Sequence, residues 1–209
     1  MIENDLYKRQ SALNLNIPEK VVILGAGGIG SWVAMSLGLI GVKHLTLIDY
    51  DIIEKHNLNR TLYREDDIDL KKVHALTDLL MERREDIDIT VFDRRVEDLQ
   101  AFEMEDLKDT LIIDARDVFD ELPIQLKDNP LIKLGYDGLS VTIILNPIYS
   151  KIWETEENRG YEIIPSFLAP CQFLATMLTT LITEPTFNMD NIVNKSINFN
   201  INEHFMGLI

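Results

Sequence analysis

The sequence predicts an α/β fold, in which a mostly parallel, Rossmann-like sheet with an antiparallel edge carries helices on both faces. Short apolar runs alternate with segments whose apolar residues recur at helical spacing, an order typical of parallel sheets. A glycine-rich turn at residues 25–30 separates the first run from the first helix. Later in the chain, Asp137-Gly138 joins two apolar runs and indicates a hairpin, which supplies the antiparallel edge.

The first βαβ unit occupies residues 21–48. Residues 21–24 (VVIL) form a continuous apolar run, which predicts a buried strand, and residues 28–40 carry apolar side chains at helical spacing. Gly41 follows in the position of a left-handed helix cap. Residues 42–48 then predict a second strand that ends at Asp49, so the unit has roughly the expected length of ~30 residues.

The rest of the chain continues the alternation. We expect helices over residues 69–84 and after Pro170, strands over 87–92, 111–113, 131–134, 139–145 and 196–202, and a polar loop over 151–164. No linker, repeat or change of composition marks a boundary. The sequence therefore predicts one domain over residues 1–209.

Composition excludes several classes of function. Twenty Lys and Arg against 35 Asp and Glu give a net charge of −15, which argues against a nucleic-acid partner. The single cysteine, Cys171, excludes an intrachain disulfide and a thiolate zinc site, and the four histidines lack ligand spacing. Residues 1–10 are polar, and prolines interrupt the uncharged stretch at 163–183, so neither a secretory signal nor a membrane span is predicted. We expect a cytoplasmic protein.

The glycine turn carries the first indication of chemistry. Residues 25–30 (GAGGIG) match Gly-x-Gly-x-x-Gly between a predicted strand and a predicted helix. Glycines let the backbone approach a polyphosphate, while the helix N-terminus offers N–H groups and a partial positive charge. Asp49 ends the next strand, where its carboxylate would accept hydrogen bonds from a ribose. The unit predicts a nucleotide site, which NAD or ATP would fit equally.

A polar loop after Asp49 favours ATP. Residues 49–60 end in Arg60, and hydride transfer has no need of such a cation. Attack on the α-phosphate of ATP does need fixed cations, because negative charge builds up on the phosphate oxygens in the transition state.

The combined motifs resemble the ThiF, MoeB and HesA family of ubiquitin-activating-enzyme-like (E1-like) adenylyltransferases. The resemblance rests on GAGGIG, on DYD at residues 49–51, on NLNR at 57–60, on Lys72 and on DARD at 114–117, and it extends over roughly residues 5 to 200. It implies an enzyme that uses ATP and Mg²⁺ to adenylate a carboxylate. The usual substrate is the C-terminus of a small ubiquitin-like or sulfur-carrier protein.

The resemblance also implies roles for individual residues. Those implied to bind ATP are Gly25, Gly27, Gly28, Gly30, Asp49, Asp51, Asn57, Arg60 and Lys72. Asp49 would hold the ribose, while Arg60 and Lys72 would also act in catalysis by neutralising the phosphates. Asp117 would hold Mg²⁺. Arg9 would reach the ATP of the other subunit, so catalysis would need a homodimer.

The chain departs from the family at several positions. It lacks the two Cys-x-x-Cys pairs that hold zinc in many relatives, and residues 151–164, which match the crossover loop, contain no cysteine for a thioester. We expect Cys171 to be a packed, inert thiol. Smaller departures are Thr61, Asp69, Arg116 and Val118, of which Arg116 adds a cation near the phosphates.

The sequence therefore predicts an adenylyltransferase that releases pyrophosphate, with a sulfur donor, an amine or a group of the same peptide as the acceptor of the adenylate. Two alternatives stay open at this point. An NAD(P)-dependent Rossmann oxidoreductase would share the first βαβ unit. A non-catalytic E1-like partner subunit would explain the absent crossover cysteine.

Overall fold

The computed structural model describes residues 5–118, 121–149 and 166–201. Seven strands form one sheet in the order β3-β2-β1-β4-β5-β6-β7. Their bounds are Lys20–Leu24 (β1), His44–Ile48 (β2), Asp88–Phe92 (β3), Leu111–Asp114 (β4), Leu131–Asp137 (β5), Ser140–Leu145 (β6) and Lys195–Asn200 (β7). The pairings from β3 to β5 are parallel and the last two are antiparallel, so the predicted sheet is confirmed. The predicted loop at 151–164 lies outside the described residues.

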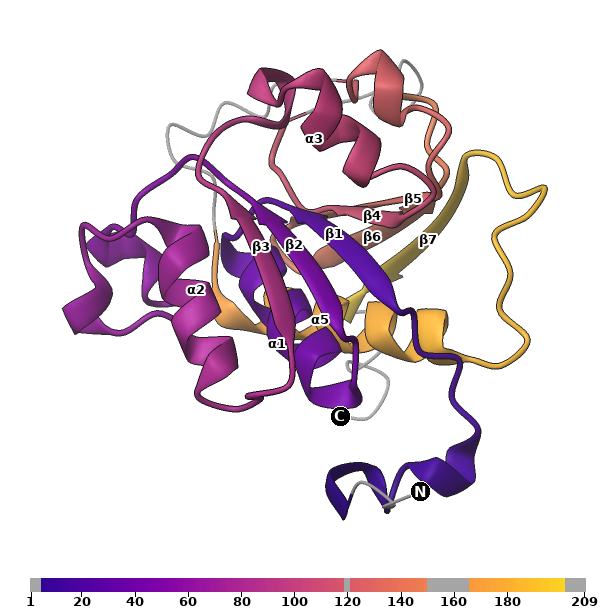
Figure 1. The fold of residues 1–209 in the computed structure, drawn as a ribbon, viewed down its shortest axis with the longest axis horizontal. Coiled ribbons are helices and arrows are strands. Elements are labelled where there is room, and N and C mark those ends of the chain that lie inside the picture. The colour runs from indigo at the N-terminus through magenta and orange to yellow at the C-terminus, as the bar shows by residue number, and fades with distance from the viewer. Residues whose placement is uncertain (1–4, 119–120, 150–165, 202–209) are drawn as a thin grey trace.

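Helices cover both faces of the sheet (Figure 1). The helices α1 (Gly28–Ile40), α2 (Lys72–Met81) and α5 (Leu168–Thr183) pack on one face, and the short α3 (Ala101–Asp106) packs on the other. In β1, Val21 and Ile23 contact the first layer while Val22 and Leu24 contact the second. Both faces of the strand are therefore buried, which explains its unbroken apolar run.

The hairpin between β5 and β6 differs from the prediction by one position. Asp137 is the last residue of β5 and pairs with Ser140. The two-residue loop is therefore Gly138-Leu139, and within it only Gly138 has a positive φ, of +58°. Asp137 keeps strand geometry because a single glycine at the first loop position suffices for this kind of turn.

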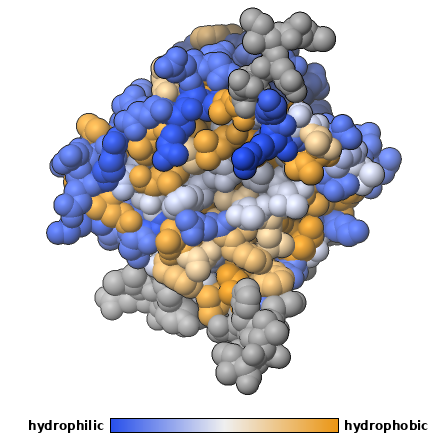
Figure 2. All heavy atoms as spheres, turned by 90° about the horizontal axis from the view of Figure 1, so that it is seen from below, coloured by the Kyte–Doolittle hydropathy of each residue, from blue (hydrophilic) through white to orange (hydrophobic). Residues whose placement is uncertain are grey.

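Part of the surface is hydrophobic. Seen from below, hydrophobic side chains gather on the face and hydrophilic ones border them (Figure 2). Separately, a groove of about 340 Å³ lies between α5 and the last two strands, lined by Ile143, Phe173, Thr176, Met177, Thr180, Leu181 and Ile197. Exposed apolar surfaces of this kind are typical of contacts with another chain.

Within the described residues, no helix is both long and apolar enough to span a membrane.

The start of α1 packs so closely on the end of β1 that a side chain has no space there. A Cβ atom on Gly30 would lie 1.8 Å from the backbone oxygen of Gly25, whereas a Cβ on Gly27 would meet nothing within 4 Å. We expect Gly30→Ala to lower the free energy of unfolding by about 2–3 kcal/mol. Gly27→Ala, the matched control, should lower it by less than about 1 kcal/mol in the same urea titration. Equal stabilities of the two variants would contradict this packing.

Candidate nucleotide site

The glycine turn lies at the carboxyl edge of the parallel strands, between β2 and β4. The Gly25 amide donates to the carbonyl of Ile48 (2.8 Å), and the Ala115 amide donates to the carbonyl of Leu24 (2.8 Å). Gly25 has a φ of +87°, and a Cβ there would lie 3.1 Å from the Ala115 oxygen. The connections after β1 and β2 run to one side and that after β4 to the other, so the turn lies at a topological switch point, where open α/β sheets bind ligands.

The N-terminus of α1 is open to a ligand. Gly27 is its N-cap, and no side chain caps it within the described part of the chain. The first N–H groups of a helix have no partner inside the helix and attract anions. A Cβ on Gly27 would meet nothing within 4 Å, so the space beside it leaves room for a phosphate.

Asp49 joins this turn to the loop that follows β2. Its Oδ2 accepts a hydrogen bond from the Ala26 amide (2.6 Å), and its Oδ1 accepts one from the Asp51 amide (2.8 Å). Each carboxylate oxygen has two lone pairs, so each can accept one more hydrogen bond. Asp49 therefore fixes the turn and still fits the predicted contact with a ribose.

Tyr63 is a supporting residue that the sequence reasoning missed. Its hydroxyl lies 2.6 Å from the Ala26 carbonyl and 3.2 Å from that of Lys72, and we assign its one proton to the shorter contact. Burial, reinforced by the charge of Asp49, raises the pKa of Tyr63 well above its usual value. The phenol thus stays a donor and holds the turn from behind. No sequence pattern marks it, because it lies in an irregular segment.

Lys72 and Asp51 form an ion pair beside the turn. The Lys72 Nζ lies 2.7 Å from the Asp51 Oδ2, and the Lys72 amide donates to the Asp51 carbonyl (3.1 Å). The Lys72 side chain is 10% exposed and that of Asp51 is 45% exposed. The structure thus brings two of the predicted ATP-binding residues together, with the lysine oriented by a carboxylate at the surface.

Arg60 lies against the glycine turn. A Cβ on Gly28 would lie 3.4 Å from the Arg60 Cδ, so the stem of the arginine covers this glycine. Its guanidinium Nη1 donates to the His56 carbonyl (2.6 Å) and to the Asn59 side chain (3.0 Å). Among the described residues, no carboxylate forms an ion pair with Arg60. The stem of Arg60 therefore lies at the turn, and no described carboxylate neutralises its charge.

Asn57 lies inside the loop, unlike Arg60, which lies against the glycine turn. It is buried, and its side-chain oxygen accepts a hydrogen bond from the Glu54 amide (3.0 Å) at the start of a 3₁₀ turn, Lys55–Asn57. Its backbone carbonyl accepts a hydrogen bond from the hydroxyl of Thr61 (2.9 Å). In this structure Asn57 shapes the loop that presents Arg60.

The two acids of the DARD motif have separate environments. Asp114 is fully buried and accepts hydrogen bonds from the Arg116 Nε (3.0 Å) and the Tyr149 hydroxyl (2.8 Å), while Asp117 is exposed. Arg116 also contacts Glu97 (2.9 Å), so the expectation that it adds a phosphate contact is not supported: two carboxylates already surround it. Of the two acids, Asp117 is the one whose carboxylate faces solvent.

A magnesium ion would fit this arrangement through Asp117 alone. The described residues contain no cluster of three or more His, Cys, Asp or Glu side chains that could hold a metal. Mg²⁺ is usually bound by one or two carboxylates together with substrate phosphates and water. Asp117 is exposed and lies two residues after Ala115, which contacts Gly25 of the glycine turn, so its single carboxylate matches what this ion needs.

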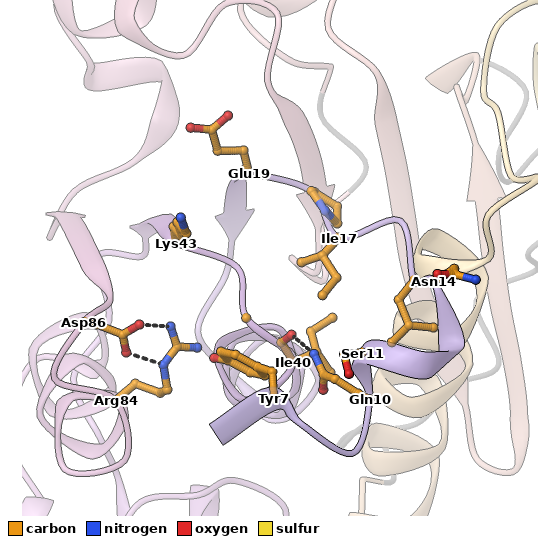
Figure 3. Close-up of a pocket in the computed structure, with 13 residues that line it drawn as sticks. Tyr7, Gln10, Ser11, Asn14, Ile17, Glu19, Ile40, Lys43, Arg84 and Asp86 are labelled. Carbon is orange, nitrogen blue, oxygen red and sulfur yellow. Dashed lines mark hydrogen bonds and ion pairs between the residues drawn. The ribbon is translucent and has the colours of Figure 1, made fainter. Parts of the chain in front are cut away.

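Arg9 lies far from the turn in its own chain. It belongs to an N-terminal arm that projects below the body in Figure 1. The arm contacts the other end of α1, where the Gln10 side chain donates to the Ile40 carbonyl (2.6 Å) and Tyr7 lies beside Arg84 (Figure 3). A cavity of about 700 Å³ separates arm and body there. A helix of 13 residues is about 20 Å long, so the arm and the glycine turn of one chain lie about a helix length apart.

Cys171 lies directly beneath the site but inside the core. It has no exposed surface, and a Cβ on Gly28 would lie 2.8 Å from its Sγ. Burial raises the pKa of this thiol. The expectation of a packed thiol is confirmed.

The buried thiol should react slowly. We expect iodoacetamide at pH 8 to label Cys171 at least ~100-fold more slowly in the native protein than in urea, since alkylation requires an accessible thiolate. Labelling is measured by intact mass, with free glutathione in the same two buffers as the control for reagent reactivity. Similar rates in both states would refute the packing described above.

The fold and site define a Rossmann-like α/β protein with a glycine turn and an aspartate at the carboxyl edge, the arrangement typical of nucleotide-binding proteins. Comparison of the sequence with protein-family profiles defines the class of protein more narrowly than the fold does. The ThiF family profile matches residues 10–122, more than half of the chain. The chain belongs to the ThiF family.

Curated relatives match less than half of the chain. "Ubiquitin-like modifier-activating enzyme 5" of Arabidopsis thaliana is 36% identical over 83 residues, which cover 40% of this chain and 19% of that protein. "NEDD8-activating enzyme E1 catalytic subunit" of Schizosaccharomyces pombe is 33% identical over 104 residues, which cover 44% and 23%. The matches therefore span about a fifth of the length of these relatives.

Solved structures share the fold over most of the chain. A crystal structure of PaaA is similar with a TM-score of 0.68 and 25% identity, covering 88% of this chain and 61% of that one. E. coli MccB with MccA-N7isoASN has a TM-score of 0.65 and 21% identity, with the same coverage. E. coli MccB with ATP has a TM-score of 0.60 and 22% identity, covering 88% and 64%.

Proposed function

We propose that this protein is an ATP-dependent adenylyltransferase that activates a carboxylate as an acyl-adenylate and releases pyrophosphate. The observation that carries the proposal is the position of Arg60, whose stem covers Gly28 and whose charge lacks a carboxylate partner among the described residues. A cation whose stem packs on a helix N-terminus is suited to a polyphosphate. A hydride-transfer enzyme would not use it, and membership of the ThiF family also counts against an oxidoreductase.

The mechanism follows from positioning and charge. The substrate carboxylate is itself the nucleophile, so no protein base is required. It attacks the α-phosphorus as the bond to the pyrophosphate oxygen breaks, and pyrophosphate leaves with that electron pair. Arg60 stabilises the charge on the phosphate oxygens, and Lys72 does so by exchanging Asp51 for a phosphate. Asp117 would hold Mg²⁺, which supplies further positive charge to the leaving group when bound.

The complete site would require two copies of the chain. Arg9 lies at the opposite end of α1 from the glycine turn, so its predicted contact with ATP would come from the partner subunit. A homodimer with two equivalent sites satisfies this requirement. In such a dimer the N-terminal arm of each chain would reach the carboxyl edge of the other.

The names of the relatives support a protein or peptide substrate. Curated relatives are named for activating ubiquitin-like modifiers, and MccB has been solved with MccA. For this chain we propose the C-terminus of a small ubiquitin-like or sulfur-carrier protein, or of a peptide. With Cys171 buried and no crossover cysteine in residues 151–164, transfer of the adenylate would not pass through a thioester to this chain. We place the reaction in the cytoplasm.

The direct test is exchange of labelled pyrophosphate into ATP. We would measure it with candidate carrier proteins and with peptides that end in Gly-Gly, and repeat it with the same substrates amidated at the C-terminus as matched controls. Exchange that depends on the free carboxylate supports adenylation. Failure of every candidate, together with no binding of ATP, would refute the proposal. ATP binding without exchange would instead favour a non-catalytic partner subunit.

A further inference from the structure

A buried lysine lies behind the exposed carboxylate of Asp117. Lys133 is on β5, with a side chain that is 3% exposed. Its Nζ donates to the backbone carbonyls of Arg116 (2.5 Å) and Val118 (3.0 Å) and lies 3.3 Å from the Asp114 Oδ1. An ammonium group has three N–H donors, so all three have acceptors here. Two of those acceptors flank Asp117 in the sequence.

Neutralising Asp114 does not require this lysine. Arg116 already donates to both oxygens of Asp114, from Nε (3.0 Å) and Nη2 (3.1 Å), and Tyr149 donates to Oδ2. Burial lowers the pKa of Lys133, and the negative charge of Asp114 only partly offsets this effect. A buried ion network often stabilises a fold less than apolar side chains of the same size would. The position of Lys133 therefore calls for another explanation than stability.

The two carbonyl contacts supply that explanation. Residues 115–118 follow β4 without regular secondary structure. The Ala115 amide donates to Leu24 of β1 and the Arg116 amide donates to the Asp114 Oδ1 (3.1 Å), but neither contact reaches the backbone from which the Asp117 side chain projects. A single ammonium that holds the carbonyls of Arg116 and Val118 fixes the peptide plane that precedes Asp117 and the carbonyl of the residue that follows it, so the backbone is held on both sides of Asp117. Groups that orient a metal ligand in this way typically change metal affinity by about 10–100-fold when they are removed.

We propose that Lys133 is a positioning residue, which fixes the backbone of residues 116–118 and thereby directs the Asp117 carboxylate toward the metal–nucleotide complex. The inference rests on the proposed function, since it concerns the Mg²⁺ that accompanies ATP. It adds a residue from β5 to a site otherwise built after β1, β2 and β4. Lys133 itself contacts neither nucleotide nor substrate in this scheme.

The test separates the metal from the nucleotide. We would titrate Mg²⁺ against a non-hydrolysable ATP analogue by calorimetry, with wild type and Lys133→Met. The variant should require about 10–100-fold more Mg²⁺, while its affinity for the analogue without metal stays within about twofold. Lys127→Met, which removes a lysine that is paired with Glu121 at the surface, is the matched control and should behave as wild type.

Hydrogen exchange of the free protein gives a second readout that does not depend on activity. Amides of residues 116–118 should exchange faster in Lys133→Met than in wild type, whereas Tyr149→Phe, which keeps both carbonyl contacts, should leave them and the Mg²⁺ requirement unchanged. If Lys133→Met does not fold, Lys133→Gln, whose amide can still donate to one carbonyl, should show a smaller change in the same direction.

The outcomes are distinct. A folded Lys133→Met or Lys133→Gln with a wild-type Mg²⁺ requirement and wild-type hydrogen exchange at residues 116–118 would overturn the positioning role. If wild type itself bound no ATP analogue with or without Mg²⁺, the proposed function would fail. The comparison of hydrogen-exchange rates would still decide whether Lys133 fixes this backbone.

Discussion

Replacing Lys72 with methionine is expected to reduce ATP–pyrophosphate exchange by about 10²–10³-fold, the usual loss when one preorganised charge-stabilising group is removed. Lys72 is the first residue of α2 and is buried beside the glycine turn, with its ammonium directed by Asp51. The methionine keeps the length of the side chain and removes only the charge. The effect should therefore appear in the rate of exchange rather than in the fold.

The neighbouring lysine provides the control. The Lys71 Nζ donates to the Tyr50 carbonyl (2.7 Å), so Lys71→Met removes the same charge one residue away without touching the Asp51 pair. It should keep exchange within about threefold of wild type, since Coulomb interactions at the surface are weak and screened. Melting temperatures of both variants should stay close to wild type, because Asp51 remains hydrated when Lys72 is lost. Equal losses in the two variants would mean that Lys72 has no specific role.

The first βαβ unit could be predicted because its signals are local. The predicted helix at 28–40 matches α1 at both ends, where Gly27 is the N-cap and Gly41 closes the helix with a φ of +115°. Glycine is the residue that adopts this conformation without strain, so the sequence itself marks the boundary. The continuous apolar run of β1 likewise reflects burial on both faces.

Two helices have weaker sequence signals, and the prediction was wrong about where one begins and missed the other. Helix α2 begins at Lys72 rather than at residue 69, because Asp69 has a φ of +71°, which no helix accommodates. Helix α3 (Ala101–Asp106) was not predicted, since its only buried residue is Met104 and six residues show no periodicity. These boundaries depend on how the chain meets its neighbours rather than on local preference.

The candidate site likewise has a part that the sequence predicts and a part that it does not. A strand followed by a glycine turn, and a second strand that ends at Asp49, determine by topology that both lie at one edge of the sheet. The pairing of Lys72 with Asp51, the support from Tyr63 and the contacts of Lys133 involve segments far apart in the sequence. No spacing rule encodes such contacts, so they became visible only when the strands and loops were placed in space.

Mixing two inactive variants should restore about a quarter of wild-type exchange, because random assembly makes half of the dimers mixed and one of the two sites in each is intact. The variants are Arg9→Ala and Asp117→Asn. Each should reduce exchange by about 10²-fold or more when assayed alone, since each removes a charge from the phosphates or their metal. In the mixed dimer, the site with Asp117 receives Arg9 from its partner, and the other site lacks both.

The arrangement of the arm makes this result decisive. Arg9 and the glycine turn lie at opposite ends of α1, so a site within one chain cannot use this arginine. The control is a mixture of Lys72→Met and Asp117→Asn, which remove residues of the same site and leave no intact site in a mixed dimer. Recovery in that control would show exchange by another route. Wild-type exchange by Arg9→Ala alone, or no recovery in the first mixture, would refute a site shared between subunits and leave Arg60 and Lys72 as its cations.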